Sequence, residues 1–188
     1  MNAHYIRLVA LAAFGLSSIL GAFADVYIKA DGTSYDGYIY KVLGGSVYLR
    51  VGEDKIAAAV SEFDADSRAA IDEWTKENPL KVDVYTKWDV QPAIKASSMP
   101  SLPEQFLAEE FKGLVSVDLV LNEAGQVIHA SIKKSTHTDL EAPSLEAAKT
   151  WIFEPAKVGG KSVRSKLRIP FKFVNNPPPP QAEEASLS

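Results

Sequence analysis

The C-terminal part of the chain carries an alternating segment that limits the fold more than any other feature. Apolar and polar side chains alternate over residues 163–173, as in a half-buried β-strand. Pro170 lies within this alternation. Because proline has no N–H to donate to a neighbouring strand, it favours a strand at the edge of a sheet. The apolar face comprises Val163, Leu167, Ile169, Phe171 and Phe173, and the basic face comprises Arg164, Lys166, Arg168 and Lys172.

An edge strand leaves one row of backbone N–H and C=O groups unpaired, and an extended peptide from another protein can pair with that row. The run from Lys157 to Lys172 contains six basic residues and no acidic one. This charge suits either a solvated edge face or an acidic partner segment. We therefore predict a site for strand addition. Its residues are Arg164, Lys166, Arg168, Pro170, Lys172 and Val174.

The elements before this strand predict a small α+β domain. Alternation over residues 113–121 and 126–132, separated by a turn that ends at Gly125, predicts a β-hairpin. An amphipathic helix that ends at Trp151 follows, and a glycine pair then turns the chain into the edge strand. Residues 103–111 predict a further helix, with proline at a first-turn position.

A W-x-F-x-P-A motif with a glycine-bearing turn joins the helix to the last strand. Together with the order of the elements, it resembles the C-terminal domain of the TonB family over residues 99–174. The resemblance implies an antiparallel sheet whose last strand, over residues 164–174, pairs with an extended segment of an outer-membrane transporter. It implies no catalysis and no cofactor. The motif residues are Trp151, Phe153, Pro155, Ala156 and Gly160.

Two functions follow from this resemblance. The first is an exported cell-envelope protein that binds an outer-membrane transporter and supports energy-coupled transport across the outer membrane, with inner-membrane motor proteins as further partners. The second is a periplasmic adaptor or scaffold that binds an envelope protein without transducing energy. An exposed edge also allows two copies to pair as a homodimer.

The first 24 residues have the pattern of an export signal. Arg7 precedes an apolar run over residues 8–20, and small residues at Ala22 and Ala24 fit cleavage by signal peptidase. This run is shorter than the roughly 20 residues that a spanning helix needs, which favours cleavage over an inner-membrane anchor at residues 8–24. Cleavage favours the adaptor, and an intact N-terminus in the inner membrane favours the transducer.

Residues 25–79 predict a separate small domain. Four short strand patterns with glycine-bearing turns precede a helix that is capped by Ser61 or Asp64 and stopped by Pro79. Strands that close on a helix in this way suggest a small β-barrel. The whole chain is therefore predicted to be α+β.

The tyrosines of this first domain are candidates for a second binding site. Residues 35–42, 47–49 and 61–74 resemble the SH3-like domain first described as a homology region in an actin-associated endocytic adaptor, which implies a binding or spacer module. Tyr38 and Tyr40 share one predicted strand face. They suit either ordinary strand packing or stacking on a sugar or a peptide.

The remaining segments connect or follow these domains. Residues 80–98 are predicted to be a linker, and residues 175–188 a disordered tail with four consecutive prolines. The formal net charge is −4, which gives no reason to expect a nucleic-acid partner.

Metal and catalytic chemistry find little support in the sequence. The chain has no cysteine, and its three histidines have no metal-ligand spacing, so no metal site is predicted. Ser135, His137 and Asp139 alternate along one loop, and residues two apart do not converge as a catalytic triad does. They are interpreted as a polar loop.

Overall fold

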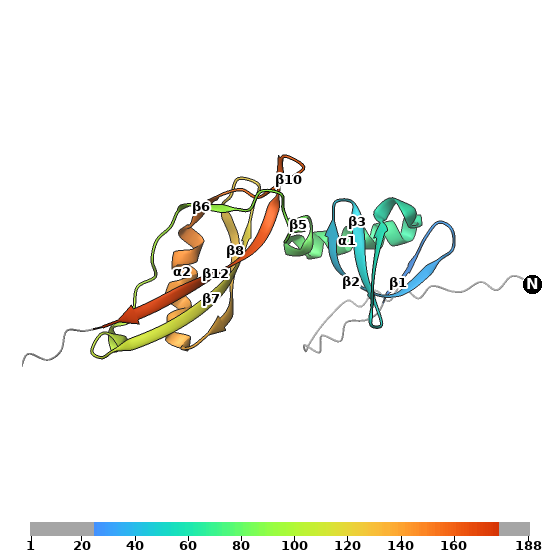
Figure 1. Cartoon of the computed structure of the whole chain (residues 1–188). Coiled ribbons are helices and arrows are strands. Elements are labelled where there is room, and N and C mark those ends of the chain that lie inside the picture. The colour runs from blue at the N-terminus through green and yellow to red at the C-terminus, as the bar shows by residue number, and fades with distance from the viewer. Residues whose placement is uncertain (1–24, 177–188) are drawn as a thin grey trace, which may run out of the picture.

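The computed structural model describes residues 25–176. The predicted export signal and nearly all of the predicted tail therefore lie outside the described residues. Figure 1 shows two units joined by a short connecting strand, β5. The first unit contains β1 (Asp25–Ile28), β2 (Ser34–Leu43), β3 (Ser46–Val51), β4 (Asp54–Ala59), the short 3-10 helix η1 (Val60–Glu62) and α1 (Ala65–Glu77).

The first unit is an antiparallel sheet in the order β1-β2-β3-β4. After η1 the chain returns to β1 through an antiparallel bridge between Lys29 and Phe63. The helix α1 begins as predicted, because the Asp64 carboxylate accepts a hydrogen bond from the Ser67 N–H at 2.8 Å. The four predicted strands and the helix are confirmed. The core of this unit comprises Tyr27, Ile39, Val42, Val47, Leu49, Ala58, Phe63 and Ile71.

The second unit is a sheet with one helix on one of its faces (Figure 1). The sheet order is β5-β12-β7-β8, and the helix α2 contacts β7 and β8. The core lies between this helix and the sheet, which accounts for the alternating burial along β12, where Ile169, Phe171 and Phe173 are buried and Leu167 is partly buried. The elements of this unit are β7 (Phe111–Leu121), β8 (Val127–Ser135), the 3-10 helix η4 (Thr138–Leu140), α2 (Glu141–Thr150), β9 (Ile152–Glu154), β10 (Lys157–Val158), β11 (Lys161–Ser162) and β12 (Arg164–Asn175).

The prediction of a helix at residues 103–111 is wrong. Only the short 3-10 helix η3 (Glu104–Phe106) forms, and β7 begins at Phe111. The Asn175 side-chain amide donates to the carbonyls of Phe106, Leu107 and Glu109 at 3.1, 3.0 and 2.8 Å. Backbone carbonyls near this turn thus bond the end of β12 in place of a continued helix.

The segment predicted to be a linker contains η2 (Pro79–Lys81) and two short strands. β5 (Val84–Tyr85) pairs in parallel with the start of β12. The sheet is therefore mixed, and the prediction of a wholly antiparallel sheet is wrong. β6 (Ala93–Ala96) pairs with β9. Between them, the Lys157 carbonyl accepts hydrogen bonds from Asp89 and Val90. This segment is therefore bonded along the second unit over much of its length.

Candidate binding edge

β12 is paired along its whole length on one side and almost unpaired on the other. Its residues from Ser165 to Asn175 pair with β7 without a break in register. On the opposite side, only Arg164 and Ser165 have partners among residues 25–176, in β5. We call the remainder of that side, residues 166–175, the free edge. Arg164 was predicted to belong to the binding row, and the structure instead pairs it with Val84.

The alternation of β7 determines which groups of β12 face this free edge. Both backbone groups of Leu114 face β8, because its carbonyl accepts from the Thr136 N–H and its N–H donates to the Thr136 hydroxyl, each at 3.0 Å. In an antiparallel sheet, successive residues direct these groups to opposite sides. The odd-numbered residues of β7 therefore face β12, and their partners in β12 are also odd-numbered. It follows that the even-numbered residues of β12 direct their N–H and C=O groups outward.

This assignment explains the proline in the strand. Pro170 is even-numbered, so the N–H that it lacks would have faced the free edge and not β7. The predicted residue Lys166 also directs its N–H to this side, but the parallel pairing of Ser165 with Tyr85 places that N–H against the Tyr85 carbonyl. Beyond β5, outward N–H groups come from Arg168, Lys172 and Val174, and the same residues with Pro170 supply outward carbonyls. The predicted residues Arg168, Pro170, Lys172 and Val174 thus form one row of available backbone groups.

Their side chains share the exposed face of the sheet, opposite α2. The central contact on this face was not predicted. Asp118 of β7 accepts hydrogen bonds from Arg168 Nε at 2.6 Å and Arg168 Nη2 at 3.3 Å, and Lys166 Nζ lies 3.1 Å from its second oxygen. Only 10% of the Asp118 side chain is exposed. The hydrogen bonds from Arg168, followed by Lys166, lower the pKa of the Asp118 carboxyl, and burial partly opposes this effect.

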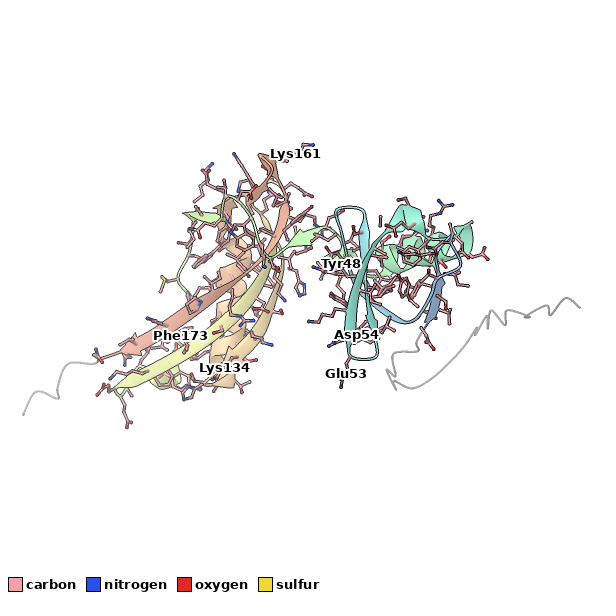
Figure 2. All side chains as sticks on the ribbon, turned by 45° about the vertical axis from the view of Figure 1, so that its right-hand side comes forward. Tyr48, Glu53, Asp54, Lys134, Lys161 and Phe173 are labelled. Atoms are coloured by element: carbon pink, nitrogen blue, oxygen red, sulfur yellow. The ribbon has the colours of Figure 1, made fainter. Side chains whose placement is uncertain are left out.

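The motif residues support the opposite face of β12. Trp151 and Phe153 are buried, and the Trp151 indole N–H donates to the Ser98 carbonyl at 2.8 Å. The Trp151 ring meets the Phe171 ring of β12 edge-on, with centroids 5.2 Å apart. Gly160 has a φ of +77° in the tight turn between β10 and β11, where a side chain would be strained. Figure 2 labels Lys161 at the tip of this hairpin and Phe173 near the other end of β12.

The residues Ser135, His137 and Asp139 of the polar loop do not form a catalytic triad. The Ser135 hydroxyl donates to the His137 backbone carbonyl at 2.7 Å, and the His137 ring contacts the Thr136 hydroxyl. Asp139 accepts from Gln105 instead of the histidine ring. Within residues 25–176, no three potential metal ligands come together.

The tyrosines of the first unit interact mainly with their own neighbours. A β-bulge between Ile39 and Lys41 places Tyr40 and Lys41 on one outer face of β2. Lys41 Nζ lies 4.0 Å from the centre of the Tyr48 ring, and the Tyr40 ring meets that ring edge-on. Figure 2 labels Tyr48 on the side of this unit that is nearer the second unit. Stacking on a ligand through Tyr38 and Tyr40 stays a prediction.

Comparison with known proteins bears on the second unit. Residues 98–174 match the family profile described as Gram-negative bacterial TonB protein C-terminal. This part of the chain is therefore similar to the TonB C-terminal domain. The resemblance predicted from the Trp151 motif is thereby confirmed for this domain, whereas the SH3-like resemblance of the first unit stays a prediction.

Two curated relatives and one solved structure are similar to the same part of the chain. Both relatives are named Protein TonB and come from two strains of Xanthomonas campestris pv. campestris. Each is 26% identical over 93 residues, which is 47% of this chain and 42% of the relative. The chain thus spans about two fifths of the length of these relatives. The solution NMR structure of the Pseudomonas aeruginosa TonB C-terminal domain is 21% identical, covers 47% of this chain and 93% of that chain, and has a TM-score of 0.35.

The matched residues contain all of β12 except its last residue and all of the free edge except Asn175. β5 and the first unit precede the matched residues. No helix within residues 25–176 is both long and apolar enough to cross a membrane.

Proposed function

We propose that this protein binds an extended segment of a partner by adding it as a strand to the free edge of β12. The observation that carries the proposal is the outward row of backbone groups at Arg168, Pro170, Lys172 and Val174. An added strand of either direction pairs with such a row. The partner is an outer-membrane transporter, and the protein acts in the cell envelope in energy-coupled transport across the outer membrane. The match of residues 98–174 to the TonB family supports this assignment.

Charge favours a particular class of partner segment. In an added strand, a residue opposite an even-numbered residue of β12 presents its side chain on the exposed face of the sheet. Lys172 has no ion pair among the described residues, while Lys166 and Arg168 share Asp118. A segment with an acidic residue opposite Lys172 and neutral or acidic residues further along fits this face. The other face of the segment would be apolar, because it extends the layer formed by Ile169, Phe171 and Phe173.

The expected affinity is modest. The free edge offers three N–H donors beyond β5, and each backbone hydrogen bond contributes about 0.5–1.5 kcal/mol net. After the cost of association, the dissociation constant should lie roughly in the micromolar range. Reversible binding of this strength suits a coupling that must engage and release its partner.

Lys172→Pro tests the proposal, with Lys172→Ala as its matched control. Both substitutions remove the lysine charge, but only proline removes the outward N–H. We expect Lys172→Pro to bind transporter-derived peptides about three- to tenfold more weakly than Lys172→Ala. Isothermal titration calorimetry measures this difference, and circular dichroism checks that both variants stay folded. Equal affinities for the two variants would contradict strand pairing at this edge.

The adaptor function is favoured by one observation. Much of residues 84–98 pairs with or bonds to the second unit, so these residues do not form a free spacer between the two units. A protein of this kind could join two partners without transmitting motion, with the first unit as a second binding module of SH3-like type. Mass spectrometry of the native N-terminus separates the two functions. Cleavage before Asp25 supports the adaptor, and an intact Met1 in the inner membrane supports the transducer.

A further inference from the structure

A short strand of the chain itself already occupies part of the binding edge. β5 pairs with Arg164 and Ser165 on the side of β12 that faces away from β7. The partner strand of the proposed function would lie on the same side, beginning next to Lys166. β5 and the partner strand therefore share one edge and meet end to end. A partner strand cannot extend to Arg164 unless it displaces β5.

The first unit holds β5 in this place. The Asp83 N–H donates to the Val42 carbonyl at 2.9 Å, and the Asp83 carboxylate accepts from the Gly44 N–H at 2.9 Å. Val82 also forms a parallel bridge with Val42. On the other side, Arg164 Nη1 donates to the Val82 carbonyl at 3.3 Å. The segment formed by residues 82–85 thus contacts both units.

The backbone at Asp83 makes this double contact geometrically feasible. Its φ is +51°, in the left-handed region that non-glycine residues enter at a cost in energy. This turn lets residues 82–85 pass from the end of β2 in the first unit to the start of β12 in the second unit. The bonds to Val42 and Gly44 hold the aspartate in this conformation, so β5 has a defined position relative to both sheets.

We infer that β5 is a register stop for the partner strand, an inference that rests on the proposed function. Lys166 and Arg168 lie two residues apart and Lys172 follows four residues later, so registers that differ by two or four residues still place basic side chains together. Edges with such repeats specify register weakly. Because β5 closes one end of the free edge, a partner strand that starts against it has a single position. The first unit thereby decides which residues of the partner face Lys172.

Tyr85→Pro removes the stop, and Tyr85→Ala is its matched control. The outward groups of Arg164 face β5 and, in a parallel pair, reach the residues on either side of its partner Val84, which include Tyr85. Proline at position 85 removes the N–H that this pairing needs, whereas alanine removes only the tyrosine side chain. The probes are synthetic peptides of alternating glutamate and valine, prepared at increasing lengths, with the full chain as the receptor.

In the wild type and Tyr85→Ala, we expect affinity to stop rising once the peptide spans Lys166 to Val174. In Tyr85→Pro, a further extension by two residues should tighten binding about three- to tenfold, because Arg164 becomes available. The Arg164 N–H also faces β5, so its hydrogen exchange reports whether β5 stays on the edge. Because β5 has only two residues, loss of the residue-85 N–H should release the whole pairing. The Arg164 amide should therefore exchange slowly in the wild type and Tyr85→Ala, and as fast as the Arg168 amide in unbound Tyr85→Pro.

Equal dependence on peptide length in all three proteins would overturn the register stop and leave the proposed function intact. Fast exchange at Arg164 in the wild type would also overturn the stop. Absence of binding by every peptide and every variant would overturn the proposed function and the stop together. The length series thus distinguishes the two failures.

Discussion

Replacement of Asp118 by asparagine tests how the exposed face of β12 is held together. The Asp118 carboxylate accepts two hydrogen bonds from Arg168, at 2.6 and 3.3 Å, and pairs with Lys166 at 3.1 Å. Asparagine keeps the size of the side chain and removes its charge. It also replaces one acceptor oxygen with a donor, which faces a cation that cannot accept a hydrogen bond.

The magnitude follows from the exposure of the three side chains. Hydrogen bonds to charged groups contribute about 1.5–3 kcal/mol when both partners are shielded. Asp118 is 10% exposed, but Arg168 and Lys166 are 53% and 46% exposed and remain solvated when the carboxylate is lost. We therefore expect Asp118→Asn to lower the free energy of unfolding by about 1–2 kcal/mol at neutral pH.

This difference should depend on pH in one direction. The hydrogen bonds from Arg168 hold the pKa of the Asp118 carboxyl below its ordinary value of 3.8. A lowered carboxyl pKa stabilises the folded protein above the unfolded-state value, and the stabilisation is lost as pH falls through the folded-state value. The gap between wild type and Asp118→Asn should thus be largest near neutral pH and should close below pH 3.8.

Urea denaturation across this pH range measures the gap. Glu146→Gln is the control, because Glu146 is an exposed carboxylate on α2 without an ion pair among the described residues. It should change the free energy of unfolding by less than about 0.5 kcal/mol. Asp118→Asn with wild-type stability at neutral pH, or with a gap that persists unchanged in acid, would refute this account of Asp118.

Two further substitutions in β12 test its backbone assignment and its packing. Pro170→Ala adds an outward N–H, so binding of the glutamate and valine peptide should tighten about two- to tenfold, and sedimentation should show more self-association. Its free energy of unfolding should change by less than about 1 kcal/mol, and a much larger loss would contradict the outward direction of Pro170. Ser165→Ala removes a fully buried hydroxyl that has no hydrogen-bond partner among the described residues, so thermal unfolding should show a gain of about 1 kcal/mol. A loss of stability would instead show that the hydroxyl is bonded.

Local patterns predicted most of the strands and both long helices. The alternation at residues 113–121 and 163–173 depends only on which side chains face the core, and both strands formed with about these limits. The same pattern placed Pro170 on an edge, because proline in a central strand would break the ladder. The capping preference of Asp64 was equally local.

The features that were missed depend on residues far apart in the chain. The pair of Asp118 with Arg168 needs the register between β7 and β12, which alternation alone does not determine. β5 has only two residues, too few to show a period, and its position depends on Gly44 and Val42 of the other unit. The prediction of a helix at residues 103–111 was wrong for a related reason. The distant Asn175 side chain donates hydrogen bonds to backbone carbonyls of this segment, and local helix propensity does not reveal such bonds.

β12 pairs with β7 more regularly than does the strand at the opposite edge of the sheet. β8 forms that other edge, and its pairing with β7 has register shifts near Ser116 and near Val120. Such bulges bend and twist a strand, so they make it a poor template for another chain. β12 pairs with β7 in one unbroken register from Ser165 to Asn175. Of the two edges, β12 therefore presents the straighter row of groups, and a partner strand should add to it in preference to β8.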